Sequence, residues 1–584
     1  MWKLQQMIGF ILGVLSLVLL ALIRPIKDYP SANDMLGITL MCGFFWVLEV
    51  SPIYITALAP LALMPLLKVT SSEIAANAYW NEIQMLVIGT YLVDLALEEV
   101  HLPRRAVLKM LIVTGVVQPG VLLFSFMFLC WLLSMFCNNI AVTLMITPFA
   151  IEIMNAAEEQ ARDDAAAASD LSDAPSSSDD EAPVDASTAE VQKFSSGLLL
   201  GIAYASTCGG LATLTGTITN EVLFGVGKMT SVIAYANWWS FAFPTSAAAF
   251  ILSYSVLWLR YCRGLKLKAL THEVLEQSYD ELVKEIGPFS RDELFVGILQ
   301  VIQFVLLFLR PTIAKHVTSP YGESLLGDPT LAMLPAVLLF FIPSSVRPGQ
   351  PLLTWPSVHE KFDFGLLFLI GGGFAISTGF IESGLNTALG KSIASWTEVV
   401  SPFWLNFIIV LLISVATQVF SAVGTATTLL PALYSAAESA IHNPLALVLP
   451  ATVACSFGFA LPTATPSNVV VLAKSQDLSR PLRVRDYCCS GLPLNILVVI
   501  VGAVISYFSG ISVYDSQTPF PKWACDEGVT CLWVPIPGVH RDGTPFTDQA
   551  CMLLASDNDS GYCILHNGTK INDEPYLADM SFMG

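Results

Sequence analysis

The sequence is short of charge. Of its 584 residues only 13% are Asp, Glu, Lys or Arg, while 54% are hydrophobic. A soluble domain of this length carries roughly twice that charged fraction, so the composition excludes an ordinary soluble protein. The sequence also lacks a Gly-x-Ser-x-Gly elbow and a pair of aspartates within an apolar span. Because these are groups that an intramembrane hydrolase would use, we predict that the protein is not an enzyme.

A cleavage signal is missing behind the first apolar block, Met7–Ile23. Lys3 precedes the block, as in a secretory signal, but the block is followed by Arg24–Lys27 instead of a run of small residues. A signal peptide needs small residues at its cleavage site. We therefore predict that this block is a retained first membrane span.

What the sequence has instead of charge is a series of long apolar blocks. Each block can cross about 30 Å of hydrocarbon as a helix, because a helix satisfies its own backbone groups there. We predict an all-α polytopic membrane protein with about 11 transmembrane helices and two re-entrant helical hairpins. In this arrangement most of the 28 Lys and Arg residues fall on the side of the N-terminus. That bias places the N-terminus in the cytoplasm and the C-terminus outside.

The net charge of −19 is concentrated in one segment. Between Glu152 and Glu190 acidic residues alternate with Ala and Ser, and Arg162 is the one basic residue. Such a segment has too little apolar surface to fold alone, so we predict a disordered acidic loop at 156–192. The loop is either a solvated spacer or a regulatory segment, and Ser176–Ser178 would be its phosphorylation sites.

The tail after the last apolar block is polar and carries two signs of an oxidising compartment. It holds four of the 12 cysteines, Cys525, Cys531, Cys551 and Cys563. It also holds two glycosylation sequons, at Asn558 and Asn567. Together they predict an extracellular, glycosylated tail with three possible disulfide pairings, in a protein of the plasma membrane.

The pattern of a hairpin followed by a broken helix occurs twice. The apolar stretches 119–153 and 402–437 are each interrupted by polar residues, and each has the length of two short helices folded back on themselves. Each is followed by an apolar span that breaks at a small, polar run ending in Asn220 or Asn468. This order is typical of inverted-repeat transporters, in which discontinuous helices bind ions near the middle of the membrane.

The alternative is that the Gly and Thr residues of these runs only let helices pack closely. That explains Gly209 and Gly210, but a buried amide such as Asn139 needs several hydrogen-bond partners. We therefore favour a binding site. The expected organisation is scaffold helices with an interfacial helix (1–118), a first transport unit (119–232), further scaffold helices (233–363), a second transport unit (364–475), a last transmembrane helix (476–511) and the tail (512–584).

These stretches resemble the divalent-anion:sodium symporter family, which includes sodium-coupled dicarboxylate, tricarboxylate and sulfate carriers. The first hairpin of that family reads Leu-Ser-Met-Trp, one residue, then Ser-Asn-Thr, and this chain has Leu-Ser-Met-Phe-Cys-Asn-Asn-Ile at 133–140. The other segments that match family signatures are Trp46–Pro52, Gly209–Asn220, Phe364–Phe374 and Thr465–Asn468.

The resemblance implies a homodimer that carries a small anion together with Na⁺ by an elevator-like movement. It implies a first sodium site at Ser134, Asn138, Asn139 and Gly216, and a second at Thr417, Ala422 and Ala464. It implies an anion site at Asn138, Asn139, Thr217, Ser421, Thr465 and Pro466. The expected partners are this anion, membrane lipid and a second copy of the chain, with no nucleic acid.

The chain departs from the family pattern at both hairpins. The first Ser-Asn-Thr triplet is Asn138–Ile140 and the second is Ser421–Val423. We predict a sodium-coupled carrier of di- or tricarboxylates such as succinate, malate or citrate. The alternatives are a sodium–sulfate symporter, an anion exchanger or uniporter, and, in another class, a non-transporting sensor or scaffold.

Overall fold

A computed structural model describes residues 4–48, 50–114, 118–170, 186–265, 284, 287–317, 326–362, 364–385, 388, 400–439, 442–517, 530–539, 545–554, 563–564 and 570–571. Within these residues, eight helices are long and apolar enough to cross a membrane. The chain is therefore an integral membrane protein, and the helical fold class expected of its membrane part is confirmed.

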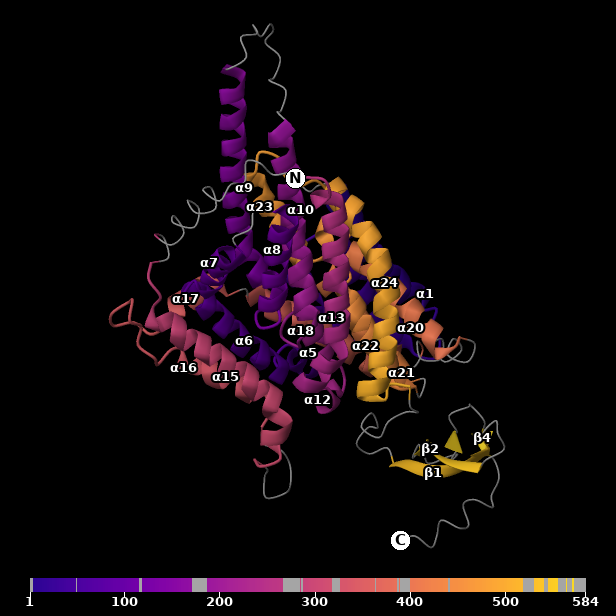
Figure 1. Ribbon diagram of the computed structural model, residues 1–584. Coiled ribbons are helices and arrows are strands. Elements are labelled where there is room, and N and C mark those ends of the chain that lie inside the picture. The colour runs from indigo at the N-terminus through magenta and orange to yellow at the C-terminus, as the bar shows by residue number, and fades with distance from the viewer. Residues whose placement is uncertain are drawn as a thin grey trace.

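Seven described helices precede the first hairpin, and Figure 1 shows the first of them on the opposite side of the bundle from the last two. They are α1 (Leu4–Ile23), α2 (Pro30–Val47), α3 (Ile53–Ala57), α4 (Ala59–Leu66), α5 (Ser72–Ala78), α6 (Glu82–Glu99) and α7 (Leu102–Thr114). α1 packs against α2 and leaves most of its apolar surface exposed, as a helix in contact with lipid does. α6 begins at a capping box in which the side chain of Asn81 accepts from the backbone of Gln84 and the side chain of Gln84 accepts in return.

The first expected hairpin is present. Its arms are α8 (Pro119–Leu133) and α9 (Asn139–Asp170), joined by a turn at 134–138. The interrupted helix that follows consists of α10 (Ala186–Leu211) and α11 (Ile218–Phe224). α12 (Met229–Val232), α13 (Tyr235–Leu257) and the π-helical turn η1 (Trp258–Cys262) complete this part. The apolar stretch of α10 is buried on every side, so this helix lies in the interior of the bundle.

Four described helices lie between η1 and the second hairpin, and the last of them falls within the expected second transport unit (364–475). They are α15 (Arg291–Ala314), α16 (Asp328–Leu338), α17 (Trp355–Lys361) and α18 (Phe364–Ser383). α15 starts at a second capping box, between Ser290 and Glu293. α16 packs against α6 and α15, and this group of helices lies beside the first hairpin (Figure 1).

The second repeat has the same order of elements as the first. Its hairpin is α20 (Pro402–Phe420) and α21 (Ala422–Ser439), and its interrupted helix is α22 (Pro444–Cys455) and α23 (Pro466–Lys474). The short 3₁₀ turns η2 (Pro462–Ala464) and η3 (Ser475–Asp477) flank α23, and α24 (Val484–Tyr514) follows. The described helices long and apolar enough to cross a membrane are α1, α9, α10, α13 with η1, α15, α18, α20 and α24. The expected number of about 11 transmembrane helices stays a prediction.

Part of the segment expected to be disordered is helical, so that prediction was wrong at both its ends. α9 continues to Asp170, beyond the end of the bundle (Figure 1), and α10 already begins at Ala186. Ala-rich sequence favours a helix. The extension is also held by an ion pair between Arg162 and Glu158, one turn apart, and by a hydrogen bond from Gln192 to Glu158. Residues 171–185 lie outside the described part.

The tail contains strands, which the sequence did not predict. β1 (Thr530–Val539) pairs antiparallel with β2 (Pro545–Leu554). β3 (Cys563–Ile564) and β4 (Lys570–Ile571) complete a four-stranded sheet in the order β1-β2-β3-β4. The sequons at Asn558 and Asn567, Cys525, and the side chains of the other three tail cysteines lie outside the described residues.

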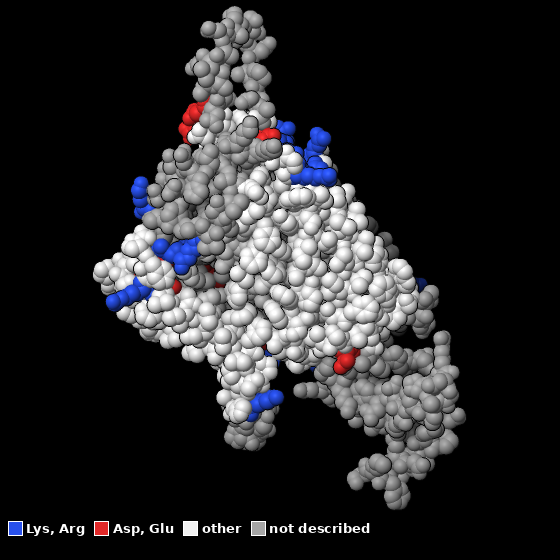
Figure 2. Space-filling view, viewed as in Figure 1, with Lys and Arg blue, Asp and Glu red and all other residues white. Residues whose placement is uncertain are grey.

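The outer surface fits a membrane environment. Figure 2 shows Lys and Arg side chains toward the ends and edges of the molecule, with a broad uncharged band between them. Exposed apolar side chains on α1, α15 and α24, such as Ile11, Val301 and Phe508, contribute to this lipid-facing surface. These surface Lys and Arg side chains thus lie outside the hydrocarbon region of a membrane. This agrees with the high free-energy cost of placing a charged side chain in hydrocarbon.

Candidate functional site

The break between α10 and α11 is held open by one buried amide. The side-chain nitrogen Nδ2 of Asn220 donates to the carbonyl oxygens of Gly210 (3.3 Å), Leu211 (3.2 Å) and Thr213 (2.7 Å). Carbonyl groups at the end of a helix have no partner within the helix, and a buried one needs a partner from elsewhere. Asn220, which is fully buried, therefore stabilises the interruption itself.

The break between α22 and α23 is built in the same way. Nδ2 of Asn468 donates to the carbonyls of Gly458 (2.9 Å) and Leu461 (3.1 Å), which stand 10 and 7 residues before it. The same separations of 10 and 7 residues occur at Asn220. Threonine is the N-cap three residues before each amide, Thr217 for α11 and Thr465 for α23. These matching contacts show that the two interrupted helices are structural repeats.

Glycine is required where the first broken helix meets the hairpin. A Cβ atom on Gly216 would lie 2.5 Å from the carbonyl oxygen of Gly210 and 2.8 Å from that of Ser134. A Cβ on Gly210 would lie 2.5 Å from the carbonyl oxygen of Gly216. Only a residue without a side chain allows backbone segments to approach so closely. As a result, several carbonyl oxygens converge at the tip of the first hairpin.

The tip of the first hairpin contacts the broken helix directly. The backbone N–H of Asn139 donates to the carbonyl of Gly216 (3.0 Å), and Nδ2 of Asn139 lies 3.5 Å from the hydroxyl oxygen of Thr217. The hydroxyl of Ser134 donates to the carbonyl of Ser206 on α10 (2.7 Å). The structure therefore brings together Ser134, Asn139, Gly216 and Thr217, four of the residues predicted from sequence. All four are buried or nearly so.

Asn138 has a different role from its neighbour. Its side-chain oxygen accepts from the backbone N–H of Ile140 (3.0 Å), so this side chain caps the start of α9. Its own backbone N–H donates to Oδ2 of Asp94 on α6 (3.0 Å). Asp94 was not among the predicted residues. The available signal was a single carboxyl group inside an otherwise apolar stretch of a membrane helix.

The tip of the second hairpin is formed by Ser421. Its backbone has φ 65° and ψ 159°, a conformation that is rare for a residue with a side chain. Its hydroxyl oxygen accepts from the backbone N–H of Gly424 (3.3 Å) and thereby caps α21. Thr417, fully buried on α20, donates to the carbonyl of Ile413 (2.9 Å). Ala422 contributes only a methyl group.

Gln418 connects the second hairpin to the second broken helix. Its Nε2 donates to the carbonyl of Phe457 (2.7 Å), and its Oε1 accepts from the backbone N–H of Ala460 (3.1 Å). In the described residues, no hydrogen bond joins Ser421 or Ala422 to the predicted loop residues Ala464, Thr465 and Pro466. The predicted residues of the second site therefore lie on elements that contact one another, but no direct hydrogen bond links them in the described part of the chain. In the first site, by contrast, a hydrogen bond links Asn139 to Gly216.

The two repeats meet between the broken helices. The hydroxyl of Ser467, at the start of α23, donates to the carbonyl of Asn139 in the first hairpin (3.4 Å). The hydroxyls of Thr219 and Ser456 lie 3.3 Å apart and link the two interruptions. Neither contact was predicted, because both depend on how the repeats are placed in three dimensions.

The groups at this centre are neutral oxygens and amides. Hydroxyl and carbonyl oxygens are suitable ligands for Na⁺, and loose carbonyls at broken helices supply them in transporters. The N-terminal ends of α9 and α23 carry the positive ends of their helix dipoles and favour a nearby anion. At α9 the N–H groups of Asn138, Asn139 and Ile140 already have partners, so there the favourable contribution is that of the dipole. A site of this chemistry can bind Na⁺ and a carboxylate side by side, with no cationic side chain.

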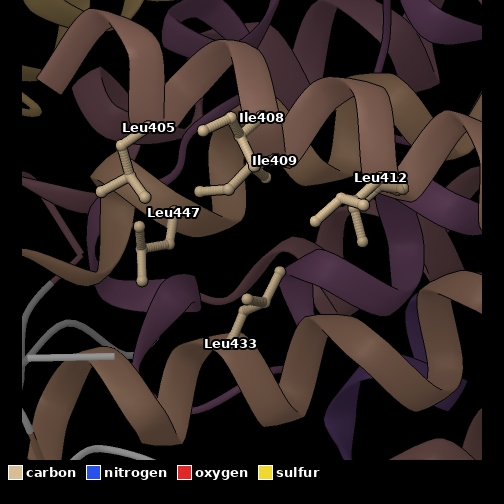
Figure 3. A pocket seen from close by; sticks show the side chains of 7 residues that line it. Leu405, Ile408, Ile409, Leu412, Leu433 and Leu447 are labelled. Carbon is tan, nitrogen blue, oxygen red and sulfur yellow. The ribbon is translucent and has the colours of Figure 1, made fainter. Parts of the chain in front are cut away.

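A hollow elsewhere in the molecule has a different chemistry. It lies between α20, α21 and α22 (Figure 3), and all the side chains that line it are aliphatic. They are Leu405, Ile408, Ile409, Leu412, Ile413, Leu433 and Leu447. An anion placed there would lose its hydration without gaining a partner, so this hollow is not the anion site.

Known proteins are similar in sequence to this chain over most of its length. Residues 2–513 match the family model described as the sodium:sulfate symporter transmembrane region. Solute carrier family 13 member 2 from Oryctolagus cuniculus is 30% identical, over 92% of this chain and 98% of that protein. The sodium-dependent dicarboxylate transporter SdcS from Staphylococcus saprophyticus is 29% identical, over 87% and 92% of the two chains. The Na⁺/citrate cotransporter from Rattus norvegicus is also 29% identical, over 83% and 92%.

The order of elements, the paired interruptions and the sequence matches all lead to one assignment. A family model that covers residues 2–513 includes both hairpins and both broken helices. The resemblance drawn from the motifs is thereby confirmed. This chain belongs to the sodium:sulfate symporter family of membrane transporters.

Proposed function

We propose that the protein is a secondary active transporter that moves a small divalent anion, of the di- or tricarboxylate class, together with Na⁺. The observation that carries the proposal is the contact of Asn139 with Gly216 and Thr217, because it gathers oxygens and amides at a hairpin tip. Relatives whose names specify sodium-dependent dicarboxylate or citrate transport align over most of the chain. The movement of Na⁺ down its electrochemical gradient would drive the transport of the anion.

The assignments of individual residues belong to this proposal. Ser134, Asn139 and Gly216 hold the first Na⁺, with Asn138 shaping the tip. Thr417, Ala422 and Ala464 surround the second Na⁺ position. The anion lies between the two tips, against Asn138, Asn139, Thr217, Ser421, Thr465 and Pro466. Asn220 and Asn468 keep both helices broken so that these groups stay available.

The transport cycle is an elevator-like movement of the two hairpins and their broken helices against the remaining helices. Residues 119–232 and 364–475 are the moving units in this proposal, and the other helices form the scaffold and the homodimer contact. The protein acts at the plasma membrane, with a cytoplasmic N-terminus and a glycosylated extracellular tail. This orientation follows from the distribution of basic residues and from the two sequons.

A second candidate function is anion exchange or uniport. It is favoured by Ala422, which stands where the family has an amide and offers no side-chain oxygen to a second Na⁺. A carrier with one weakened sodium site would still bind and move the anion but would depend less on the sodium gradient. Uptake in media with and without sodium separates the two functions.

We expect uptake of radiolabelled succinate, citrate or sulfate by cells expressing the protein to require sodium. Replacement of sodium by choline should abolish it. Asn139→Ala should lower the uptake roughly tenfold to a hundredfold, the effect of losing hydrogen bonds that total about 1–3 kcal/mol. Asn155→Ala, on the exposed part of the same helix, is the matched control and should transport as the wild type does.

Other results of the uptake experiment would favour a different function. Equal uptake in sodium and choline would favour exchange or uniport. No uptake of any of the three anions, with the protein demonstrated at the cell surface, would contradict the carrier proposal and favour a sensor or scaffold. If Asn139→Ala transported normally, the first hairpin tip would not be part of the site.

A further inference from the structure

A small polar cavity lies between α6, α15 and the tip of the first hairpin. The oxygen-bearing side chains that line it are Thr90, Asp94, Thr215, Gln300 and Gln303. Asp94 and Gln300 both bind the hairpin. Asp94 accepts from the backbone N–H of Asn138 (3.0 Å), and Nε2 of Gln300 donates to the carbonyl of Phe136 (2.6 Å). The cavity therefore borders the proposed transport site but is separate from it.

Asp94 has no compensating positive charge. Its residue is 6% exposed, and no Lys, Arg or His forms an ion pair with it in the described part of the chain. On the adjoining helices, Arg310 forms its ion pair with Asp328 (2.8 Å) and not with Asp94. An isolated carboxylate in apolar surroundings is very costly, so a buried one is normally paired with a cation.

The two glutamines present acceptors to the same cavity. Because Nε2 of Gln300 is engaged by Phe136, its Oε1 is the atom left over, and this atom is buried without a hydrogen-bond partner. Gln303 donates from Nε2 to the carbonyls of Gly89 (3.2 Å) and Ala332 (3.0 Å), which also leaves its oxygen as an acceptor. A buried acceptor without a donor costs about 1–3 kcal/mol.

A second buried carboxyl group lies close by. Glu221 on α11 is 3% exposed, and its Oε2 has no hydrogen-bond partner. It interacts electrostatically with Asp94. The other ionisable groups that face these two acids are Cys137 and Tyr235, which are neutral when protonated. The region thus collects negative charge and oxygen acceptors around one cavity.

We propose that this cavity binds a sodium ion, in addition to the ions held at the two hairpin tips. The carboxylate of Asp94, Oε1 of Gln300 and the hydroxyl oxygens of Thr90 and Thr215 are its ligands, and Glu221 supplies the second negative charge. Hard cations take oxygen ligands of this kind. The cavity lining offers one carboxylate with hydroxyl and amide oxygens and no His or Cys, which fits a hard alkali ion rather than a transition metal.

The position of this ion would link cation binding to the hairpin. Two of its ligands also hold backbone groups at the hairpin tip, so the complete cavity exists only while the hairpin is in this place. This consequence rests on the proposed transport function. The binding site itself does not, because it can be measured without any transported anion.

The test is equilibrium binding of ²²Na⁺ to the purified full-length protein in detergent, with no anion present. We expect Asp94→Asn to bind one Na⁺ per protomer fewer than the wild type. Glu221→Gln should weaken the binding of one Na⁺ at least tenfold, an effect of about 1.4 kcal/mol. Glu98→Gln is the control, because Glu98 is on the same helix but is exposed and pairs with Lys361 (3.5 Å). It should bind as the wild type does.

Two results would overturn the proposal. If Asp94→Asn and Glu221→Gln bind the same number of ions with the same affinity as the wild type, the acids are neutralised by protons and the cavity is not a sodium site. If Asp94→Asn loses all binding through damage to the hairpin, Glu221→Gln decides, because within the described part of the chain the side chain of Glu221 has no hydrogen bond to a hairpin residue. Unchanged binding in that variant contradicts the proposal. Absence of anion uptake would leave the binding result intact and would count only against the proposed function.

Discussion

Gly216→Ala is expected to abolish sodium-dependent anion uptake, with a loss of at least about a hundredfold. The added methyl group would lie 2.5 Å from the carbonyl oxygen of Gly210 and 2.8 Å from that of Ser134. Both atoms belong to the backbone, so no side-chain rotation relieves the contact, and the hairpin tip must move away from the broken helix. A displacement of about 1 Å at a site of oriented groups costs roughly a hundredfold in rate. Uptake by cells with matched surface expression measures the effect.

The sequence offers a control for the same substitution. A Cβ atom on Gly43, within α2, would meet nothing within 4 Å. Gly43→Ala should therefore transport normally. Normal transport by Gly216→Ala as well would mean that the contact between the first hairpin and the broken helix does not form the site.

Asn468→Asp and Asn220→Asp are expected to destabilise the folded protein by similar amounts, about 3–5 kcal/mol each. The substituted carboxylate has the shape of the amide but cannot donate to the helix-end carbonyls, and it buries an unpaired charge. In each case the lost donor serves carbonyl groups 10 and 7 residues earlier in the chain. Thermal unfolding of the purified variants, followed by size-exclusion chromatography, measures the loss.

The comparison between positions is the informative part of this experiment. Asn237→Asp, at an exposed position in the first turn of α13, should unfold at the wild-type temperature. Similar losses at Asn220 and Asn468 would agree with a structural repeat. A large loss at one and none at the other would show that the two interruptions are held by different interactions.

Much of the membrane architecture could be predicted, because local chemistry marks it. Pro119 and Pro402 start the first arms of the two hairpins, in agreement with the boundaries read from sequence, and proline favours the first turn of a helix. Asn220 and Asn468 were conspicuous because an amide in an apolar span needs several partners. The equal sequence separation of Asn220 from Gly210 and of Asn468 from Gly458 is also visible in the sequence. Only the hydrogen bonds show that each amide binds the carbonyl group of that glycine.

The remaining features depend on contacts between distant segments. Gln418 is ordinary in sequence, yet it binds the loop at Phe457 and Ala460. Asp94 and Gln300 meet at a cavity although more than 200 residues separate them. The acidic segment was expected to be disordered because of its charge and its lack of apolar surface, and this underestimated the helix propensity of its alanines and the Glu158–Arg162 ion pair. The tail strand β1 was not predicted because it contains Pro535, Pro537 and Gly538, and proline and glycine in a sequence argue against a strand.

The central claim is that sodium drives the anion against its own gradient, and concentrative uptake into proteoliposomes tests it most directly. Purified protein would be reconstituted, an inward sodium gradient imposed, and radiolabelled succinate followed with citrate and sulfate in parallel. The account predicts a transient accumulation of at least one anion above its external concentration, abolished when an ionophore collapses the sodium gradient. Uptake that only reaches the external concentration, at the same rate with and without the gradient, would contradict sodium coupling.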